Sequence, residues 1–213
     1  PGICSGCGAC VGVDESHQTL LKYSEFGPVP NFENLETDLP DFTLSVCPSH
    51  RLNYPRLYRE FWNVNESNPI TGEVLKARTG YASDNATLKA SSSGGVMTLV
   101  ISYLLRTRQI DAVMTVGQGM PDPISARVTI IDNIDELKKS TQSVYIPVSV
   151  LDIIRDLDPQ KKYAITCLPD QAAALRKLQS LGHEKANAIH YVLGPYTGTA
   201  IYPAAINSFL KSN

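Results

Sequence analysis

Residues 91–118 read SSSGGVMTLVISYLLRTRQIDAVMTVGQ, and this stretch decides the fold. A Ser-Ser-Ser-Gly-Gly turn precedes an apolar segment that predicts a helix over about 96–108. The segment IDAVMTVGQ follows as a buried strand, bounded by glycine and by a Pro-Asp-Pro turn. A turn, a helix and a buried strand in close succession are typical of an α/β sheet.

The same alternation continues toward the C-terminal end. Strands are predicted at ARVTIID, KKYAITCLP and NAIHYVLGP, and helices at SVLDIIRDLD, DQAAALRKLQSLG and AIYPAAINSFLK. Asp or Asn is expected to cap the short helix that follows ARVTIID, and Gly182 the end of DQAAALRKLQSLG. The pattern predicts an α/β domain with a mixed, partly parallel sheet.

The residues before this domain lack such periodicity. Residues 1–55 are rich in cysteine and proline and indicate loops and short turns around something other than a large core. Residues 56–90 are interpreted as a linker, and 91–213 as the α/β domain. Neither end looks finished, so we expect a fragment of a longer protein, with the domain truncated at its C-terminus.

Composition excludes several classes of function. A net charge of −2 offers no concentrated positive charge for nucleic acid or anionic membranes. No apolar run reaches the roughly 18 residues of a membrane-spanning helix, and the first residues do not resemble a signal peptide. We therefore expect a cytoplasmic protein that neither binds nucleic acid nor spans a membrane.

The cysteines point to a metal centre. Only five occur in 213 residues, and Cys4, Cys7 and Cys10 form C-x2-C-x2-C, while Cys47 is followed by Pro48. Bacterial ferredoxins use a related run, in which the last cysteine precedes proline. Thiolates on a tight loop can each reach a different iron of a 4Fe–4S cluster, so the pattern favours this cluster if the chain brings Cys47 back.

Other interpretations of the cysteines stay open. Zinc prefers two separated pairs or a mixture of cysteine and histidine, and His50 lies three residues after Cys47. A disulfide framework is disfavoured in the cytosol. Gly6 and Gly8 would let the backbone curl around an inorganic core. Cys167 ends an apolar strand and is interpreted as a small buried hydrophobic residue.

The SSSGG turn offers hydroxyls and free amide hydrogens at a positive helix end, which suits a phosphate or pyrophosphate. An ordinary helix cap would have the same sequence. Asp170 and Gln171 are predicted to cap their helix, and Arg176 and Lys177 to form a solvated helix face.

Together with the cysteines, the segments SSSGGVMTLVISYLL, IDAVMTVG, QSVYIPVSVLDIIRDL and KYAITCLPDQAAALRKLQ, in this order, resemble the beta-subunit family of coenzyme F420-reducing hydrogenase and formate dehydrogenase. The resemblance covers nearly the whole chain. It differs at Val144, where the family often has lysine, and at Cys167 and Asp170, where the family has glycine and cysteine.

The resemblance implies an iron–sulfur flavoprotein oxidoreductase. Electrons would pass between a 4Fe–4S cluster, FAD and coenzyme F420 or another organic acceptor. Partners would be a small-molecule redox substrate and an electron-donating or -accepting protein, such as ferredoxin or hydrogenase or dehydrogenase subunits. No catalytic residue can be assigned. By matching position, the cluster ligands would be Cys4, Cys7, Cys10 and Cys47, and the flavin contacts Ser92, Ser93, Gly94, Gly95, Ser143 and Tyr145.

The alternative is a binding or assembly module without catalysis, in which zinc or a cluster only staples the N-terminal loops. The residues at positions 144 and 170 favour this alternative.

Overall fold

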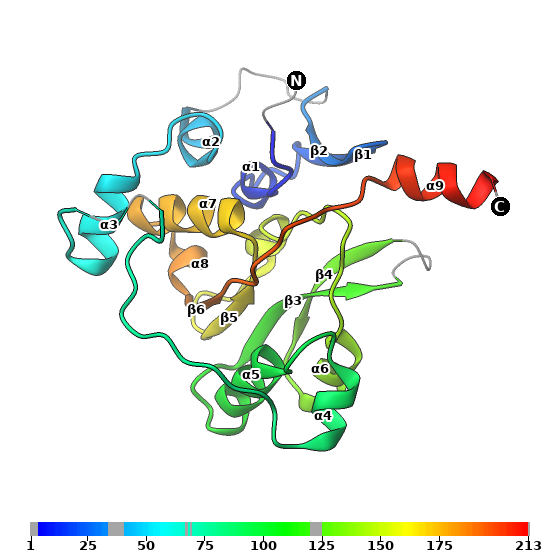
Figure 1. Cartoon of the computed structure of the whole chain (residues 1–213). Helices are drawn as coiled ribbons and strands as arrows, with labels where there is room; N and C mark the ends of the chain where they lie inside the picture. The colour runs from blue at the N-terminus through cyan, green and yellow to red at the C-terminus, as the bar shows by residue number, and fades with distance from the viewer. Residues whose placement is uncertain (1–3, 34–40, 67, 69, 120–124, 213) are drawn as a thin grey trace.

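The computed structural model describes residues 4–33, 41–66, 68, 70–119 and 125–212. A sheet of four strands lies at the centre of the molecule (Figure 1). The strand order is β4-β3-β5-β6. β3 (Ala112–Gln118) pairs antiparallel with β4 (Ala126–Ile131) and parallel with β5 (Tyr163–Thr166), and β5 pairs parallel with β6 (Ile189–Leu193). The predicted α/β fold with a mixed sheet is confirmed.

Alternating side chains of the central strands feed two separate cores. Met114 and Ile165 point into a large core that includes helix α7 (Pro169–Ser180). Their neighbours Val113 and Ala164 point the opposite way, as the period of two along a strand requires. That second core is closed by helices α5 (Val96–Arg106) and α6 (Ile134–Leu137).

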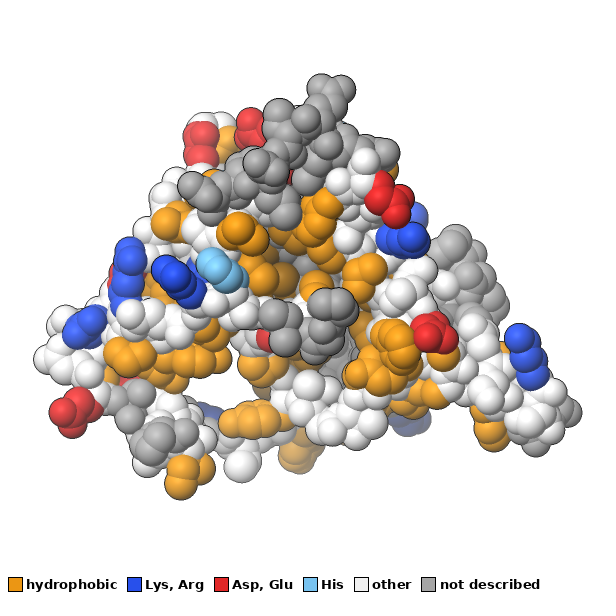
Figure 2. All heavy atoms as spheres, turned by 90° about the horizontal axis from the view of Figure 1, so that it is seen from above, with side chains coloured by type: hydrophobic (Ala, Val, Ile, Leu, Met, Phe, Trp, Pro, Cys, Tyr) orange, Lys and Arg blue, Asp and Glu red, His pale blue; other side chains and the backbone are white. Residues whose placement is uncertain are grey.

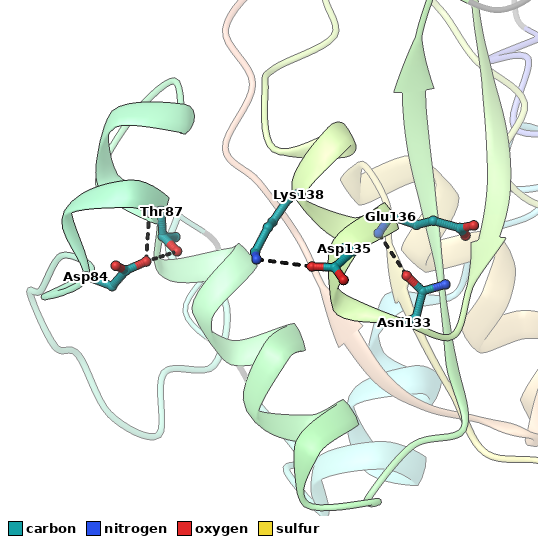
Figure 3. Close-up of polar contacts among 6 residues, drawn as sticks. All are labelled: Asp84, Thr87, Asn133, Asp135, Glu136 and Lys138. Carbon is teal, nitrogen blue, oxygen red and sulfur yellow. Dashed lines mark hydrogen bonds and ion pairs between the residues drawn. The ribbon is translucent and has the colours of Figure 1, made fainter.

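Helix α5 begins where the SSSGG turn predicts. Gly95 adopts a left-handed φ of 71° immediately before the helix, a conformation that favours glycine. Helix α4 (Asn85–Ala90) precedes the turn and is capped by Asp84, whose carboxylate accepts from Thr87, as Figure 3 shows. Asn133 caps α6 by accepting from the Glu136 amide, which confirms the predicted cap.

The segment SVLDIIRDLD is not the α-helix that its apolar spacing predicts. It forms a short 3₁₀ turn, η2 (Asp152–Asp156). The Leu151 amide donates to the Cys7 carbonyl at 3.0 Å rather than to a carbonyl in its own segment. Packing against the cysteine loop therefore replaces the first helical hydrogen bonds, and the propensity of the segment is overridden.

More regular structure precedes the domain than the sequence indicated. Helix α1 (Ala9–Gly12), the antiparallel strands β1 (Leu20–Ser24) and β2 (Gly27–Asn31), and helix α2 (Asp41–Val46) form the N-terminal region. Helix α3 (Tyr54–Trp62) extends into residues interpreted as linker. The Asn53 side chain accepts from the Arg56 amide and caps α3. Two helices complete the chain, α8 (Glu184–Asn187) and α9 (Pro203–Ser212). The division into 1–55, 56–90 and 91–213 stays a prediction.

Within the described ranges, no helix combines the length and apolar character needed to cross a membrane.

Replacing Gly12 with alanine tests the contact between α1 and the η2 segment. A Cβ at Gly12 would lie 2.0 Å from the Leu151 carbonyl oxygen, whereas a Cβ at Gly80 would have no heavy atom within 4 Å. Alanine gains up to about 1 kcal/mol of helix propensity, but overpacking costs about 1–3 kcal/mol or more, so the clash dominates. We expect Gly12→Ala to lower the free energy of unfolding by about 2 kcal/mol in urea titrations. Gly80→Ala, the control, should change it by less than about 0.5 kcal/mol; equal effects would contradict the contact.

Candidate functional site

Cys4, Cys7, Cys10 and Cys47 line one small pocket at the N-terminal end of the molecule. Cys4 and Cys7 lie in the loop that leads into α1, Cys10 lies within α1, and Cys47 directly follows α2. Cys4 is exposed, Cys7 is buried, and the other two are half-buried. The structure thus brings the distant fourth cysteine back to the other three, as the cluster hypothesis requires.

Two glycines allow the loop to curl inside this packing. Gly6 and Gly8 have φ values of 68° and 85°, where other residues are strained. A Cβ at Gly6 would lie 2.7 Å from the Pro28 carbonyl oxygen, and one at Gly8 would lie 2.8 Å from the Asp152 amide nitrogen. Close backbone approach from both sides therefore requires glycine at both positions.

Side chains from the α/β domain hold the two cysteine segments in place. The buried Ser149 hydroxyl donates to the Gly6 carbonyl at 2.6 Å. The Lys177 ammonium donates to the carbonyls of Cys47 and Arg51, at 2.6 and 2.7 Å. These contacts make the pocket a joint product of the N-terminal region and the domain.

The pocket is a poor environment for free thiolates. Burial raises the pKa of the Cys7 thiol to about 11 and that of Cys10 to about 12, and the charges of neighbouring cysteines add to both increases. A cationic centre would be needed to hold these sulfurs deprotonated, because buried charges require compensation. His50, the candidate zinc ligand, is exposed and is not among the residues that line the pocket.

The cysteines are not arranged as a compact site for one ion. In the part of the chain that the structure describes, no three side chains of His, Cys, Asp or Glu form a group that could hold a metal ion. A tetrahedral zinc ion draws its sulfur ligands to within about 4 Å of one another, because Zn–S bonds are about 2.3 Å long. The described residues therefore offer no group of this kind for a single zinc ion.

The predicted flavin-contacting segments also meet. The Ser143 amide donates to the Ser92 hydroxyl at 2.7 Å, which joins the SSSGG turn to the Ser-Val-Tyr segment. The Gly94 carbonyl accepts from the Ala82 amide at 2.7 Å. The side chains of Ser92, Ser93 and Tyr145 are exposed at this surface. The turn lies at the start of α5, whose N-terminal amides have no side-chain cap at Gly95.

One extended segment connects the two groups of residues. At its start Ser143 bonds to Ser92, and at its end Ser149 bonds to Gly6. Six residues span at most about 20 Å when fully extended. The pocket and the SSSGG turn are therefore separated by about this length or less along the segment.

Comparison with known proteins agrees with this arrangement. Residues 77–155, which include the SSSGG turn and the connecting segment, match the family described as coenzyme F420 hydrogenase/dehydrogenase, beta subunit N-term. The match covers this part of the chain, and the family resemblance expected from the sequence is confirmed there.

Two known proteins resemble this chain. The coenzyme F420-dependent sulfite reductase of Methanocaldococcus jannaschii is 36% identical over 88 residues, which cover 40% of this chain and 14% of that protein. One chain of the F420-reducing [NiFe] hydrogenase complex from Methanosarcina barkeri shares the fold, with a TM-score of 0.57 and 18% identity. The match covers 62% of this chain and 47% of that one. The chain thus spans less than half the length of either protein.

Predictions for four residues of α7 and its approach can be compared with the structure. Cys167 is buried in the large core, as predicted. The Gln171 side chain accepts from the Leu168 amide and donates to the Val148 carbonyl, which confirms a capping role. The predicted solvated face is wrong: Arg176 lies 4.7 Å from the centre of the Phe61 ring, and Lys177 binds the cysteine segment. Neither contact has a local sequence signal, since the partners lie far apart in the chain.

A second, polar cavity of about 270 Å³ lies beside the cysteine loop and was not predicted. Its polar side chains come from β1, β4 and the η2 segment: Tyr23, Arg127, Ser149, Asp152, Arg155 and Asp156. Asp152 Oδ1 and Arg155 Nη1 are buried and have no hydrogen-bond partner among the described residues.

Figure 2 views the molecule from above, toward the face that carries α1, α2 and the β1–β2 hairpin. Apolar side chains gather near its centre, and Lys and Arg side chains lie toward its edges.

Replacing Asp152 with asparagine should stabilise the protein in a pH-dependent way. Burial raises the pKa of the Asp152 carboxyl to about 6, so the folded state favours the protonated form. This contribution is fully present below pH 4 and is lost as the pH rises through 6. We expect Asp152→Asn to match the wild type at pH 4 and to exceed its free energy of unfolding by about 2 kcal/mol at pH 7.5. Urea titrations across this range would measure the difference; a difference that stays constant with pH would contradict the assignment.

Proposed function

We propose that this protein is part of an iron–sulfur flavoprotein oxidoreductase, which passes electrons between a 4Fe–4S cluster, FAD and an organic carrier. The observation that carries this proposal is the meeting of Cys4, Cys7, Cys10 and Cys47 around one pocket. Two separate segments supply these residues. The first ten residues contain only three cysteines. A 4Fe–4S cluster with four cysteine ligands therefore requires Cys47 to lie beside them.

The residues around the pocket fit a cluster better than a zinc ion. Each ligand of a four-iron cluster binds a different iron, so the sulfurs stand wider apart than around a single ion. No compact site for a single ion is found among the described residues, so the proposal of a cluster rests on the four cysteines that line the pocket. The apolar burial of Cys7 and Cys10, which disfavours free thiolates, suits a centre whose irons neutralise the sulfur charge.

The SSSGG turn fits the pyrophosphate of FAD. Its serine hydroxyls and the uncapped amides at the start of α5 are donors at the positive end of a helix of 11 residues. When bound, FAD supplies the conversion between hydride transfer and single-electron transfer. Ser92, held by the Ser143 amide, and the exposed Tyr145 would bind and orient the cofactor. The connecting segment spans at most about 20 Å, so the two proposed cofactor sites would be separated by about this length or less along the segment.

Coenzyme F420 is the proposed organic carrier, and hydrogenase- or reductase-type subunits, or a ferredoxin, are the proposed electron partners. The family description and the printed names of both relatives support this choice. The sulfite reductase and the hydrogenase complex are proteins much longer than the matched region. We therefore assign this chain to electron transfer within a larger assembly and leave the final substrate to experiment.

The cluster can be tested by comparing two cysteine variants. Cys47 lines the pocket, whereas Cys167 is buried in the core and does not line it. After anaerobic reconstitution with iron and sulfide, the wild type and Cys167→Ala should each hold about four irons per chain. Cys47→Ala should lose more than half of this iron and the visible absorption of the cluster. Elemental analysis and absorption spectroscopy measure both quantities.

Equal iron in the two variants would contradict a role for Cys47. Uptake of one zinc per chain in place of iron, with no bound flavin, would support the stapled binding module instead.

Flavin binding can be tested at Ser92. Ser92→Ala removes the acceptor of the Ser143 amide and one hydroxyl of the proposed pyrophosphate site, and we expect the Kd for FAD to rise about tenfold, the effect of one or two hydrogen bonds. Ser45→Ala, the control, removes a serine that only donates to the Phe42 carbonyl in α2. Titration of flavin fluorescence gives both constants. Wild-type protein that does not bind FAD would contradict the flavin assignment.

A further inference from the structure

Lys177 is the side chain of the α/β domain that holds the fourth cysteine. It lies near the end of α7, and its ammonium donates to the carbonyls of Cys47 and Arg51. Both bonds are short, at 2.6 and 2.7 Å, as expected for a charged donor. Because the two carbonyls flank the turn after α2, one side chain fixes the path of the chain on both sides of Pro48.

The same ammonium brings positive charge to the pocket. It interacts electrostatically with the sulfurs of Cys47 and Cys7. The opposing influence is Asp170, whose carboxylate interacts with Cys7. Lys177 is half-buried, so solvent screens its charge less than that of an exposed lysine.

We propose that Lys177 is a positioning residue of the cysteine site, which both anchors Cys47 and favours the reduced, more negative state of the group bound there. This inference rests on the proposed function. It assigns to Lys177 an effect on the reduction potential of the bound group, in addition to its structural contacts. Reduction adds one electron, supplied by an external reductant, and a nearby cation stabilises the added charge.

The test compares variants that separate charge from anchoring. Lys177→Arg keeps the charge and can donate to both carbonyls. Lys177→Met removes both functions, and Lys177→Gln keeps a donor without the charge. Lys185→Met serves as the matched control, because Lys185 also donates to a backbone carbonyl, but that of Arg155 in η2 rather than that of a cysteine.

The measured quantity is the reduction potential of the anaerobically reconstituted protein, with iron content and urea stability alongside. We expect Lys177→Met and Lys177→Gln to disfavour reduction about tenfold, which corresponds to about 59 mV for one electron. Lys177→Arg and Lys185→Met should keep the wild-type potential. Lys185→Met should nevertheless lose stability, which separates a structural effect from an electrostatic one.

Each outcome bears on a distinct statement. If the wild type binds no iron, the proposed function fails and this inference falls with it. If the wild type is loaded but Lys177→Met and Lys177→Gln keep its potential, only the inference on Lys177 is overturned. If Lys177→Met does not fold or loses its iron, Lys177→Gln against Lys177→Arg still decides the effect of the charge. If both of these also lose iron, the tuning role is overturned and anchoring alone remains.

Discussion

Backbone contact between α1 and the segment before η2 is the constraint on which the rest of the structure depends. The Leu151 amide donates to the Cys7 carbonyl, and Gly8 and Gly12 approach Leu151 and Asp152 so closely that no side chain would fit between them. This contact fixes the direction in which the cysteine loop opens. It also replaces helical hydrogen bonds in residues 149–158, which contain a 3₁₀ turn rather than the helix that their apolar spacing favours.

The cysteine pocket shows how a small N-terminal region depends on a larger domain. An apolar pocket that collects four sulfurs is unfavourable unless their charge is compensated. Ser149 and Lys177, both from the α/β domain, bond to the backbone of the loop segments rather than to the sulfurs. The sulfur atoms therefore remain available, while the domain supplies the order that short loops cannot maintain alone.

Sequence reasoning worked where the signal is local and failed where it is not. The apolar run after SSSGG predicted α5, and Asn133 predicted the start of α6, because periodicity and capping act within a few residues. The spacing of Cys4, Cys7 and Cys10 indicated one site, and Cys47-Pro48 suggested the fourth member. Lys177 was misinterpreted because its partners lie in another segment. Helix α3 was missed although Asn53 and Pro55 mark a helix start, because the residues that follow were interpreted as a linker. The polar cavity could not be foreseen, since three separate elements contribute to it.

The path of the C-terminal segment has a consequence for how the protein is made. After β6 the chain crosses the connecting segment, where the Ile201 amide donates to the Tyr145 carbonyl, and then reaches the β1–β2 turn, where Tyr202 packs edge-to-face on Phe26 and the Ala204 amide donates to Glu25 (Figure 1). The hairpin is synthesised before residues 201–204, which lie far from it along the chain. Contacts between such distant residues form slowly. The hairpin therefore gains these contacts only after residues 201–204 have been synthesised.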